Sequence, residues 1–207
     1  MKHTTLFSTL AAAIALGLAS QPATALEKGD LLLRFGLANV SPNDGSSGGA
    51  GDNDAVGVED DTQPFINVTW MLSDNLGLDV LGATPFTHDI TLEGSGKIAE
   101  TEQLPPTVGL QYHFTPQSNV RPYVGAGINY TTFFNEKATA VIDSISLDDS
   151  WGLAAQAGVD VDINRDWFFN ADLRYMQIDT TAKTNLAEDI DVDIDPWVIS
   201  LGVGMTF

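Results

Sequence analysis

The sequence contains no cysteine, and its 9 lysine and arginine residues are far outnumbered by 28 aspartate and glutamate residues. Without cysteine the chain has no disulfide, no thiolate ligand for zinc and no thiol chemistry. A formal net charge of −19 repels phosphate backbones, which argues against nucleic-acid binding. After residue 25 no apolar run reaches the roughly 18 residues that a membrane-spanning helix needs.

The first 25 residues have the form of an export signal. An apolar stretch runs from Leu10 to Ala19, and residues 23–25 (Ala-Thr-Ala) match the small-x-small pattern of a signal-peptidase site. We therefore expect residues 1–25 to be a cleaved signal peptide and residues 26–207 to form one domain. Export without a helical anchor leaves the periplasm, the exterior and the bacterial outer membrane as destinations.

The end of the chain alternates between two kinds of residue. From Trp197 to Phe207 every second side chain is apolar, and most of those between are small or polar. This period of two predicts a strand, and its length suits the ~9–11 residues of a tilted transmembrane strand. Strands cross lipid only in closed barrels, because an open edge leaves backbone groups unpaired. An edge strand of a soluble sandwich is the alternative at this stage.

Seven earlier segments show the same alternation. The eight predicted strands cover residues 30–40, 64–72, 76–83, 107–114, 121–131, 151–163, 167–178 and 197–207. Short connections alternate with long ones, and the predicted long loops are residues 41–61, 87–106, 134–150 and an acidic segment before the last strand. That asymmetry is typical of outer-membrane barrels, which have short periplasmic turns and long outer loops.

The predicted fold is therefore all-β: an eight-stranded antiparallel transmembrane β-barrel with long extracellular loops. Aromatic residues gather near the short turns, where a membrane-interface girdle would lie: Trp70, Tyr112, Phe114, Trp167, Phe169 and Phe207. A soluble lipocalin-like barrel is the rival, but its outer face should be polar. We expect the terminal Phe207 to be the assembly signal for the barrel-assembly machinery.

The direction of each strand sorts the inward residues by height. Those expected near the periplasmic end form a polar plug, comprising Arg34, Asp79, His113, Arg121, Asp160, Asp162, Asp172 and Arg174. Those expected nearer the long loops form a hydrophobic lumen, comprising Phe65, Leu81, Ala83, Met176, Ile178 and Val198. Charges inside so narrow a barrel must pair to offset their desolvation, so a continuous water-filled pore is not expected.

Two prolines mark a possible lateral exit. Pro85 and Pro196 lie at the outer ends of the third and eighth predicted strands, where each removes a donor from the hydrogen-bond ladder. An apolar solute stopped by the charged floor would leave sideways through such a weakened wall. Simple termination of a strand at the membrane edge is the equally plain alternative.

Several motifs carry a family resemblance. They are Ala83–Phe86 with His88–Ile90, Leu104–Thr107, the whole run from Arg121 to Phe134, Asp149–Gly152, Ile163–Trp167 and Asp195–Trp197. Together they resemble the outer membrane protein W family. The resemblance implies a narrow, apolar eight-stranded barrel proposed to take small hydrophobic compounds across the outer membrane. It also implies an inward leucine at Leu81 and an aromatic where this chain has Arg174.

The predicted function is passive passage of small hydrophobic molecules through the apolar upper lumen. The expected partners are outer-membrane lipid and lipopolysaccharide, small apolar solutes and the barrel-assembly machinery, with no cofactor. An enzyme is disfavoured, because neither His88 nor His113 has a serine and a carboxylate at triad spacing. A receptor or envelope-structural barrel and a small cation-preferring channel are the alternatives.

No metal site is predicted. Aspartates alternate at positions 189, 191, 193 and 195, but no glycine turn or bidentate glutamate stands at the spacing of a calcium loop. A solvated acidic face is therefore expected, with loosely held divalent cations bridging to anionic headgroups as the alternative. The acidity also suits a protein from a saline habitat.

Overall fold

The computed structural model describes residues 25–43, 45–47, 56–92, 96–138, 144–184 and 190–207. The predicted signal peptide lies outside the described residues, except for Ala25. No helix among the described residues is long and apolar enough to span a membrane.

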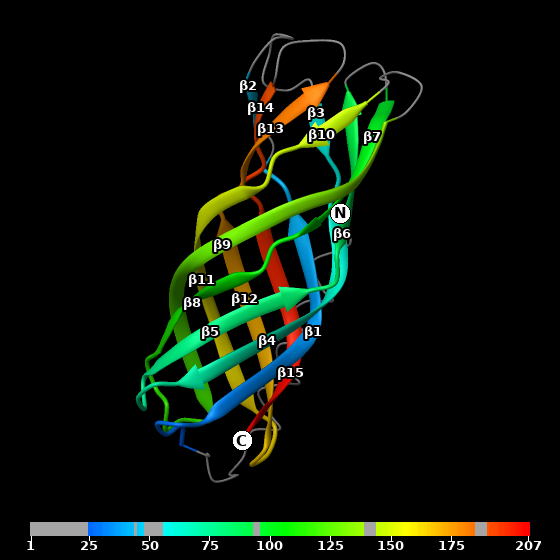
Figure 1. The fold of residues 1–207 in the computed structure, drawn as a ribbon. Helices are drawn as coiled ribbons and strands as arrows, with labels where there is room; N and C mark the ends of the chain where they lie inside the picture. The colour runs from blue at the N-terminus through cyan, green and yellow to red at the C-terminus, as the bar shows by residue number, and fades with distance from the viewer. Residues whose placement is uncertain (1–24, 44, 48–55, 93–95, 139–143, 185–189) are drawn as a thin grey trace, which may run out of the picture.

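Eight antiparallel strands form a closed barrel (Figure 1). Around the barrel they are β1 (Leu31–Ser41), β4 (Asp61–Met71), β5 (Leu76–Ala83), β8 (Thr107–His113), β9 (Val120–Ala138), β11 (Ser150–Asp162), β12 (Trp167–Met176) and β15 (Trp197–Thr206). The pairing of β1 with β15 and of β9 with β11 completes the circle. The predicted eight-stranded barrel is confirmed.

The predicted long loops are not simply loops, because each carries additional strands beyond the barrel. On one side β3 (Val56–Val58), β6 (Phe86–Leu92) and β7 (Gly96–Leu104) extend the sheet along the outer half of β9. On the other side β2 (Gly45–Ser47), β10 (Ile145–Leu147), β13 (Asp179–Thr184) and β14 (Ile190–Asp193) form a four-stranded sheet. Among the described side chains, none of the exposed large apolar residues belongs to these strands, so they lack the apolar outer face that marked the barrel strands.

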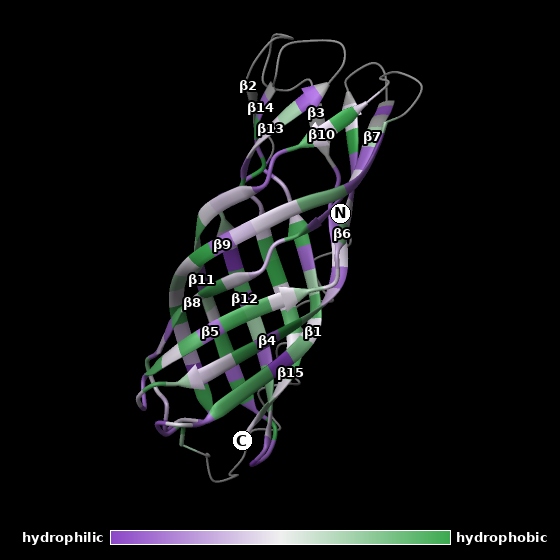
Figure 2. Cartoon of the chain, in the orientation of Figure 1, coloured by the Kyte–Doolittle hydropathy of each residue, from purple (hydrophilic) through white to green (hydrophobic). Residues whose placement is uncertain are grey.

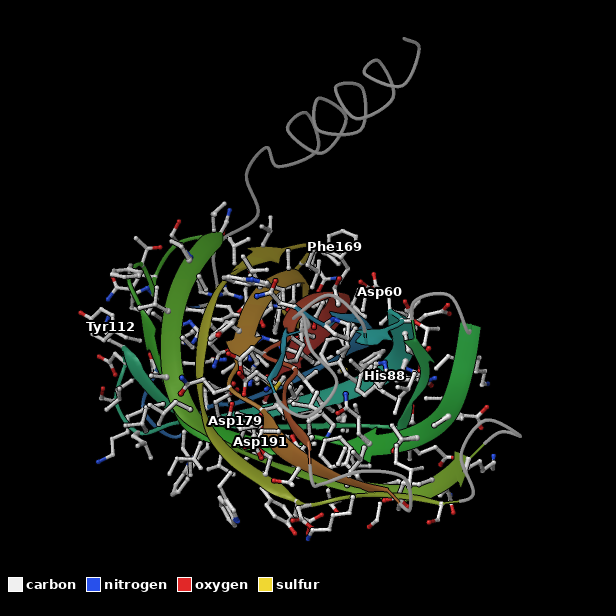
Figure 3. The ribbon with its side chains drawn as sticks, turned by 90° about the horizontal axis from the view of Figure 1, so that it is seen from above. Asp60, His88, Tyr112, Phe169, Asp179 and Asp191 are labelled. Carbon is white, nitrogen blue, oxygen red and sulfur yellow. The ribbon has the colours of Figure 1, made fainter. Side chains whose placement is uncertain are left out.

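The outer face of the barrel is apolar. Figure 2 shows hydrophobic residues recurring along the barrel strands, and large side chains there are strongly exposed, including Leu37, Ile66, Leu153, Ile199 and Leu201. Of the predicted girdle, Tyr112 and Phe169 point outward (Figure 3). Exposed apolar area of this extent requires lipid, which excludes the soluble barrel.

The interior has three layers. A small apolar cluster of Leu26, Leu32, Met71 and Phe168 closes the periplasmic end. Charged and amide side chains fill the middle, and a larger apolar cluster occupies the upper lumen and continues between the extracellular strands. The polar plug therefore lies above an apolar base. The sequence analysis placed the plug at the periplasmic end and did not predict this base. Leu26 helps to form that base because its segment folds beneath the barrel, where its N–H bonds to the carbonyl of Pro116.

Candidate functional site: the barrel lumen

Arg34 is a cation of the polar layer and forms a two-pronged ion pair with Asp160. Its Nε and Nη2 atoms donate to the two carboxylate oxygens at 3.0 and 2.7 Å. Its Nη1 donates to Asn67 at 2.9 Å and to Thr69 at 2.7 Å. Both charged side chains are buried, so this full set of bonds offsets the cost of removing them from water.

Asp79 is the acceptor at the centre of the network. Its Oδ1 accepts hydrogen bonds from Asn67, Thr69 and Gln111 at 2.7, 3.0 and 2.9 Å. Its Oδ2 accepts from Gln156 at 3.1 Å and from Arg174 at 3.3 Å. These donors come from four strands besides β5, so the network crosses the lumen.

The other predicted plug residues lie around this centre. Arg121 pairs with Asp162 at 2.6 Å, and the Tyr123 hydroxyl donates to Asp172 at 2.9 Å. His113 is fully buried and packs against Tyr123, with ring centroids 5.2 Å apart. Within the described part of the chain neither ring nitrogen of His113 has a hydrogen-bond partner. The structure thus brings seven of the eight predicted residues into ion pairs or hydrogen bonds, and His113 beside them.

The sequence analysis did not single out the uncharged members of the network. These are Asn67, Thr69, Gln111, Tyr123, Gln156 and Asn170, all buried and all hydrogen-bonded to charged residues. They share the inward parity of Arg34 and Asp79 along their strands. That shared parity was the signal that could have identified them.

An apolar cavity lies above the polar network. It has about 270 Å³ of empty volume, counted with the open space at its mouth, and is lined by Ala38, Val40, Phe65, Leu81, Ala83, Phe86, Pro105, Met176 and Val198. Five of the six predicted hydrophobic lumen residues are among them. The sixth, Ile178, is completely buried in the apolar cluster that includes these side chains.

The wall beside this cavity has a gap in its hydrogen-bond ladder near Pro85. The pairing of β5 with β8 ends at Leu81 and Thr107, and the pairing of β6 with β7 begins at Phe86 and Gln103. Among the described residues, none of 82–85 is paired with any of 104–106. The gap contains three prolines, since Pro105 and Pro106 face the segment of Pro85, and proline lacks the N–H that a ladder requires.

The barrel wall around Pro196 has backbone hydrogen bonds on both sides of the proline, so it has no gap like the one near Pro85. The Pro196 carbonyl accepts from Met176, and the Ile194 N–H donates to Ile178, so backbone bonds flank the proline on both sides. Asp195 adopts a left-handed φ of 37°, and its carboxylate accepts from the Ile178 N–H at 3.0 Å and the Tyr175 hydroxyl at 2.7 Å. Thus the two predicted exit prolines occupy different surroundings, one at a gap and one at a bridged bend.

The comparisons with known proteins now decide the family. The model of the OmpW family matches residues 27–207. The chain belongs to the OmpW family. Outer membrane protein W of Escherichia coli is 44% identical over 208 residues, which cover 96% of this chain and 98% of that protein. This OmpW-family chain is accordingly an outer-membrane protein.

Two further similarities support the assignment. The crystal structure of OprG from Pseudomonas aeruginosa has a TM-score of 0.83 and 39% identity, covering 88% of this chain and 98% of OprG. PahQ, a dibenzothiophene metabolism operon protein of Pseudomonas aeruginosa, is 32% identical over 79% of this OmpW-family chain and 76% of its own length. The OprG structure agrees with the barrel described above, whose terminal Phe207 is exposed and bonds to Leu31 through its backbone.

Proposed function

We propose that this barrel admits small apolar solutes from outside the cell and releases them sideways into the outer membrane. The solute enters between the extracellular strands and rests in the apolar cavity around Leu81 and Met176. It then leaves through the gap between residues 82–85 and residues 104–106. The observation that carries the proposal is that Leu81, Ala83, Phe86 and Pro105 line the cavity and also lie in this gap or next to it.

The floor of the cavity supports a sideways exit. An apolar solute moving straight down would have to separate the bonds of Asp79 and Arg34, both of which are buried. Breaking one partner from a buried ion pair costs about 3–5 kcal/mol, which a solute with no polar groups cannot repay. Passage through the gap breaks no ladder bond between residues 82–85 and 104–106, because none joins them.

The chemical class of the solute is supported by the lining and by one relative. All nine lining side chains are apolar, so a hydrocarbon loses no hydrogen bond on entering the cavity. The name of PahQ links that relative to an operon for the metabolism of dibenzothiophene, an apolar aromatic compound. The proposal assigns transport without a chemical step, so it requires no catalytic residue.

A reversible lock across the gap tests the exit. The chain has no cysteine, so Thr84→Cys with Leu104→Cys introduces the only thiols, at positions that would face each other if the β5–β8 register continued. In cells lacking their own OmpW proteins, we expect oxidation to reduce uptake of labelled n-octane at least fivefold. Reduction of the disulfide should restore uptake.

The matched control is Leu37→Cys with Leu201→Cys. These residues are paired across β1 and β15 and face the lipid, so their disulfide stiffens the wall away from the gap. Oxidation of this pair should leave uptake unchanged. If the lock at residues 84 and 104 forms and octane uptake persists, the exit lies elsewhere, and the bend at Pro196 becomes the candidate.

A further inference from the structure

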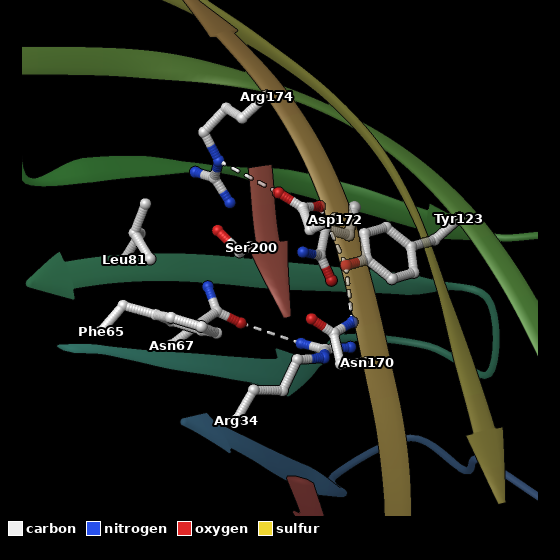
Figure 4. A pocket seen from close by; sticks show the side chains of 10 residues that line it. Arg34, Phe65, Asn67, Leu81, Tyr123, Asn170, Asp172, Arg174 and Ser200 are labelled. Carbon is white, nitrogen blue, oxygen red and sulfur yellow. Dashed lines mark hydrogen bonds and ion pairs between the residues drawn. The ribbon is translucent and has the colours of Figure 1, made fainter. Parts of the chain in front are cut away.

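A second, smaller cavity lies directly below the apolar one and has a polar lining. It is bordered by Arg34, Phe65, Asn67, Leu81, Gln111, Tyr123, Asn170, Asp172, Arg174 and Ser200 (Figure 4). Phe65 and Leu81 line both cavities, so the two are neighbours along the lumen. Each of the two cavities encloses room for roughly one water-sized group, and an apolar chain would extend into the open space counted at the mouth of the upper one. An apolar chain in the upper cavity could therefore place one small polar group in the lower one.

Three polar groups come from residues that line the lower cavity, and two of them, Arg174 Nε and Asp172 Oδ1, form a long ion pair with each other. The Arg174 Nε has no hydrogen-bond acceptor among the described residues, although the side chain is only 4% exposed. It lies 3.6 Å from Asp172 Oδ1, which is too long for a hydrogen bond. The buried Ser200 side chain also lines this cavity (Figure 4). A donor, an acceptor and a hydroxyl thus meet at one small space.

The remaining atoms of these residues are already engaged. Arg174 Nη2 donates to Gln156 at 2.7 Å and to Asp79 at 3.3 Å. Asp172 Oδ2 accepts from Tyr123 at 2.9 Å. Of the charged residues that line the cavity, a carboxylate ligand would meet Asp172, and an ammonium ligand would meet Arg34 and Arg174, so a like charge opposes each. The cavity therefore favours an uncharged group that both accepts and donates a hydrogen bond.

We propose that the lumen binds apolar chains with one terminal hydroxyl, such as medium-chain primary alcohols, in preference to hydrocarbons of equal length. The hydroxyl accepts from Arg174 Nε and donates to Asp172 Oδ1 or Ser200, and the alkyl chain lies in the upper cavity. This inference rests on the proposed function, because it assigns a subclass of ligand to the same route. A hydrocarbon in that position leaves the Arg174 Nε without a hydrogen bond.

The test compares three probes on the full-length protein in lipid nanodiscs: 1-octanol, n-octane and octanoate. Binding is followed by NMR, through the Arg174 Nε–H resonance and contacts of the ligand methyl group with Leu81 and Met176. Each affinity is corrected for partition into protein-free nanodiscs. We expect 1-octanol to bind about tenfold more tightly than either other probe, since a hydrogen bond to a charged group contributes about 1.5–3 kcal/mol.

Two variants separate the hydroxyl site from the apolar route. Ser200→Ala and Arg174→Lys should each bring the affinities for 1-octanol and n-octane within about twofold of each other. Arg165→Lys, in an exposed periplasmic turn, is the matched control and should keep the preference. Ser200→Ala removes a single oxygen, so it tests the site even if Arg174→Lys fails to fold.

The possible outcomes are distinct. Equal binding of 1-octanol and n-octane by the wild type would overturn the inference and leave the proposed function standing, with water occupying the lower cavity. Tighter binding of octanoate would overturn the assignment of an uncharged head group. Failure of every probe to contact Leu81 and Met176 would count against both the inference and the proposed function.

Discussion

Inside the barrel, small inward residues are needed to leave room for the large aromatic side chains that contact the buried charges. A side chain at Gly158 would collide with the ring of Tyr123, and one at Gly204 would collide with the ring of Phe168. These inward glycines leave the space in which the two aromatic rings lie. The guanidinium carbon of Arg34 then lies 5.2 Å from the Tyr123 ring centre and 5.6 Å from that of Phe168. The aromatic faces and the hydrogen bonds together hold this buried cation.

The Arg34–Asp160 pair gives a prediction about stability. We expect Arg34→Ala to lower the free energy of unfolding by about 3–5 kcal/mol, because Asp160 would remain buried without its cation. Urea unfolding in lipid vesicles, followed by tryptophan fluorescence, measures this change. The double variant Arg34→Met with Asp160→Leu should lose less than Arg34→Ala, since it leaves no unpaired charge. A loss below about 1 kcal/mol for Arg34→Ala, similar to that of exposed Arg165→Ala, would contradict this account.

At the scale of elements, one surface ion pair joins the outer half of β9 to β7, and a second ion pair within β7 shares its carboxylate. Glu100 accepts from Lys137 at 2.8 Å and from Lys97 at 2.9 Å. These hydrogen bonds and the nearby positive charges lower the pKa of Glu100 from 4.5 to about 2. A carboxyl group with a lowered pKa stabilises the folded state above its ordinary pKa, and this contribution is lost as the pH falls through the folded-state value.

We therefore expect the extracellular strands to loosen between pH 4.5 and about 2. Amide hydrogen exchange in β7 and the outer half of β9 should accelerate over this range relative to the barrel strands, after correction for intrinsic rates. Glu100→Gln should remove most of that dependence on pH, and 0.5 M salt should weaken it because exposed pairs are screened. Exchange that accelerates equally in Glu100→Gln would assign the effect to other carboxyl groups.

The sequence predicted the barrel strands better than the strands beyond them. Barrel strands alternate an apolar face against lipid with small or polar inward residues. Outward apolar residues such as Leu37 and Leu201, spaced two apart from others of their kind, therefore indicated the strands. In β6 the apolar residues Phe86 and Ile90 point inward, while Thr87 and Asp89 face water. That pattern of a half-buried strand is present in the sequence but short and interrupted by His88. The gap beside Pro85 lies between the end of the β5–β8 pairing and the start of the β6–β7 pairing. The sequence of one strand does not show where its pairing with another strand ends.

For the molecule as a whole, barrel closure decides which charges meet. The sequence predicted a polar layer beneath an apolar one, and the inward positions of Arg34 and Asp79 followed from alternation. The partner of Arg34 lies 126 residues away, so its identity depends on the height of each residue after the barrel closes. The amides of Asn67 and Gln111 complete the layer. The result is a layer of hydrogen-bonded side chains that spans the lumen from strand to strand.

This closed layer predicts the electrical behaviour of the barrel. We expect the purified protein in planar bilayers to carry no steady ionic current, because an ion would have to displace the bonds around Asp79 and Arg34. The triple variant Asn67→Ala, Gln111→Ala and Gln156→Ala removes the bridging amides but keeps the charges, so water should enter and the current should rise at least tenfold. Leu37→Ala, Ile199→Ala and Leu201→Ala, on the lipid face, form the control and should stay silent. A steady cation current through the wild type that persists after neutralisation of Asp79 and Asp160 would instead favour the small-channel function, since the plug would then not block ions.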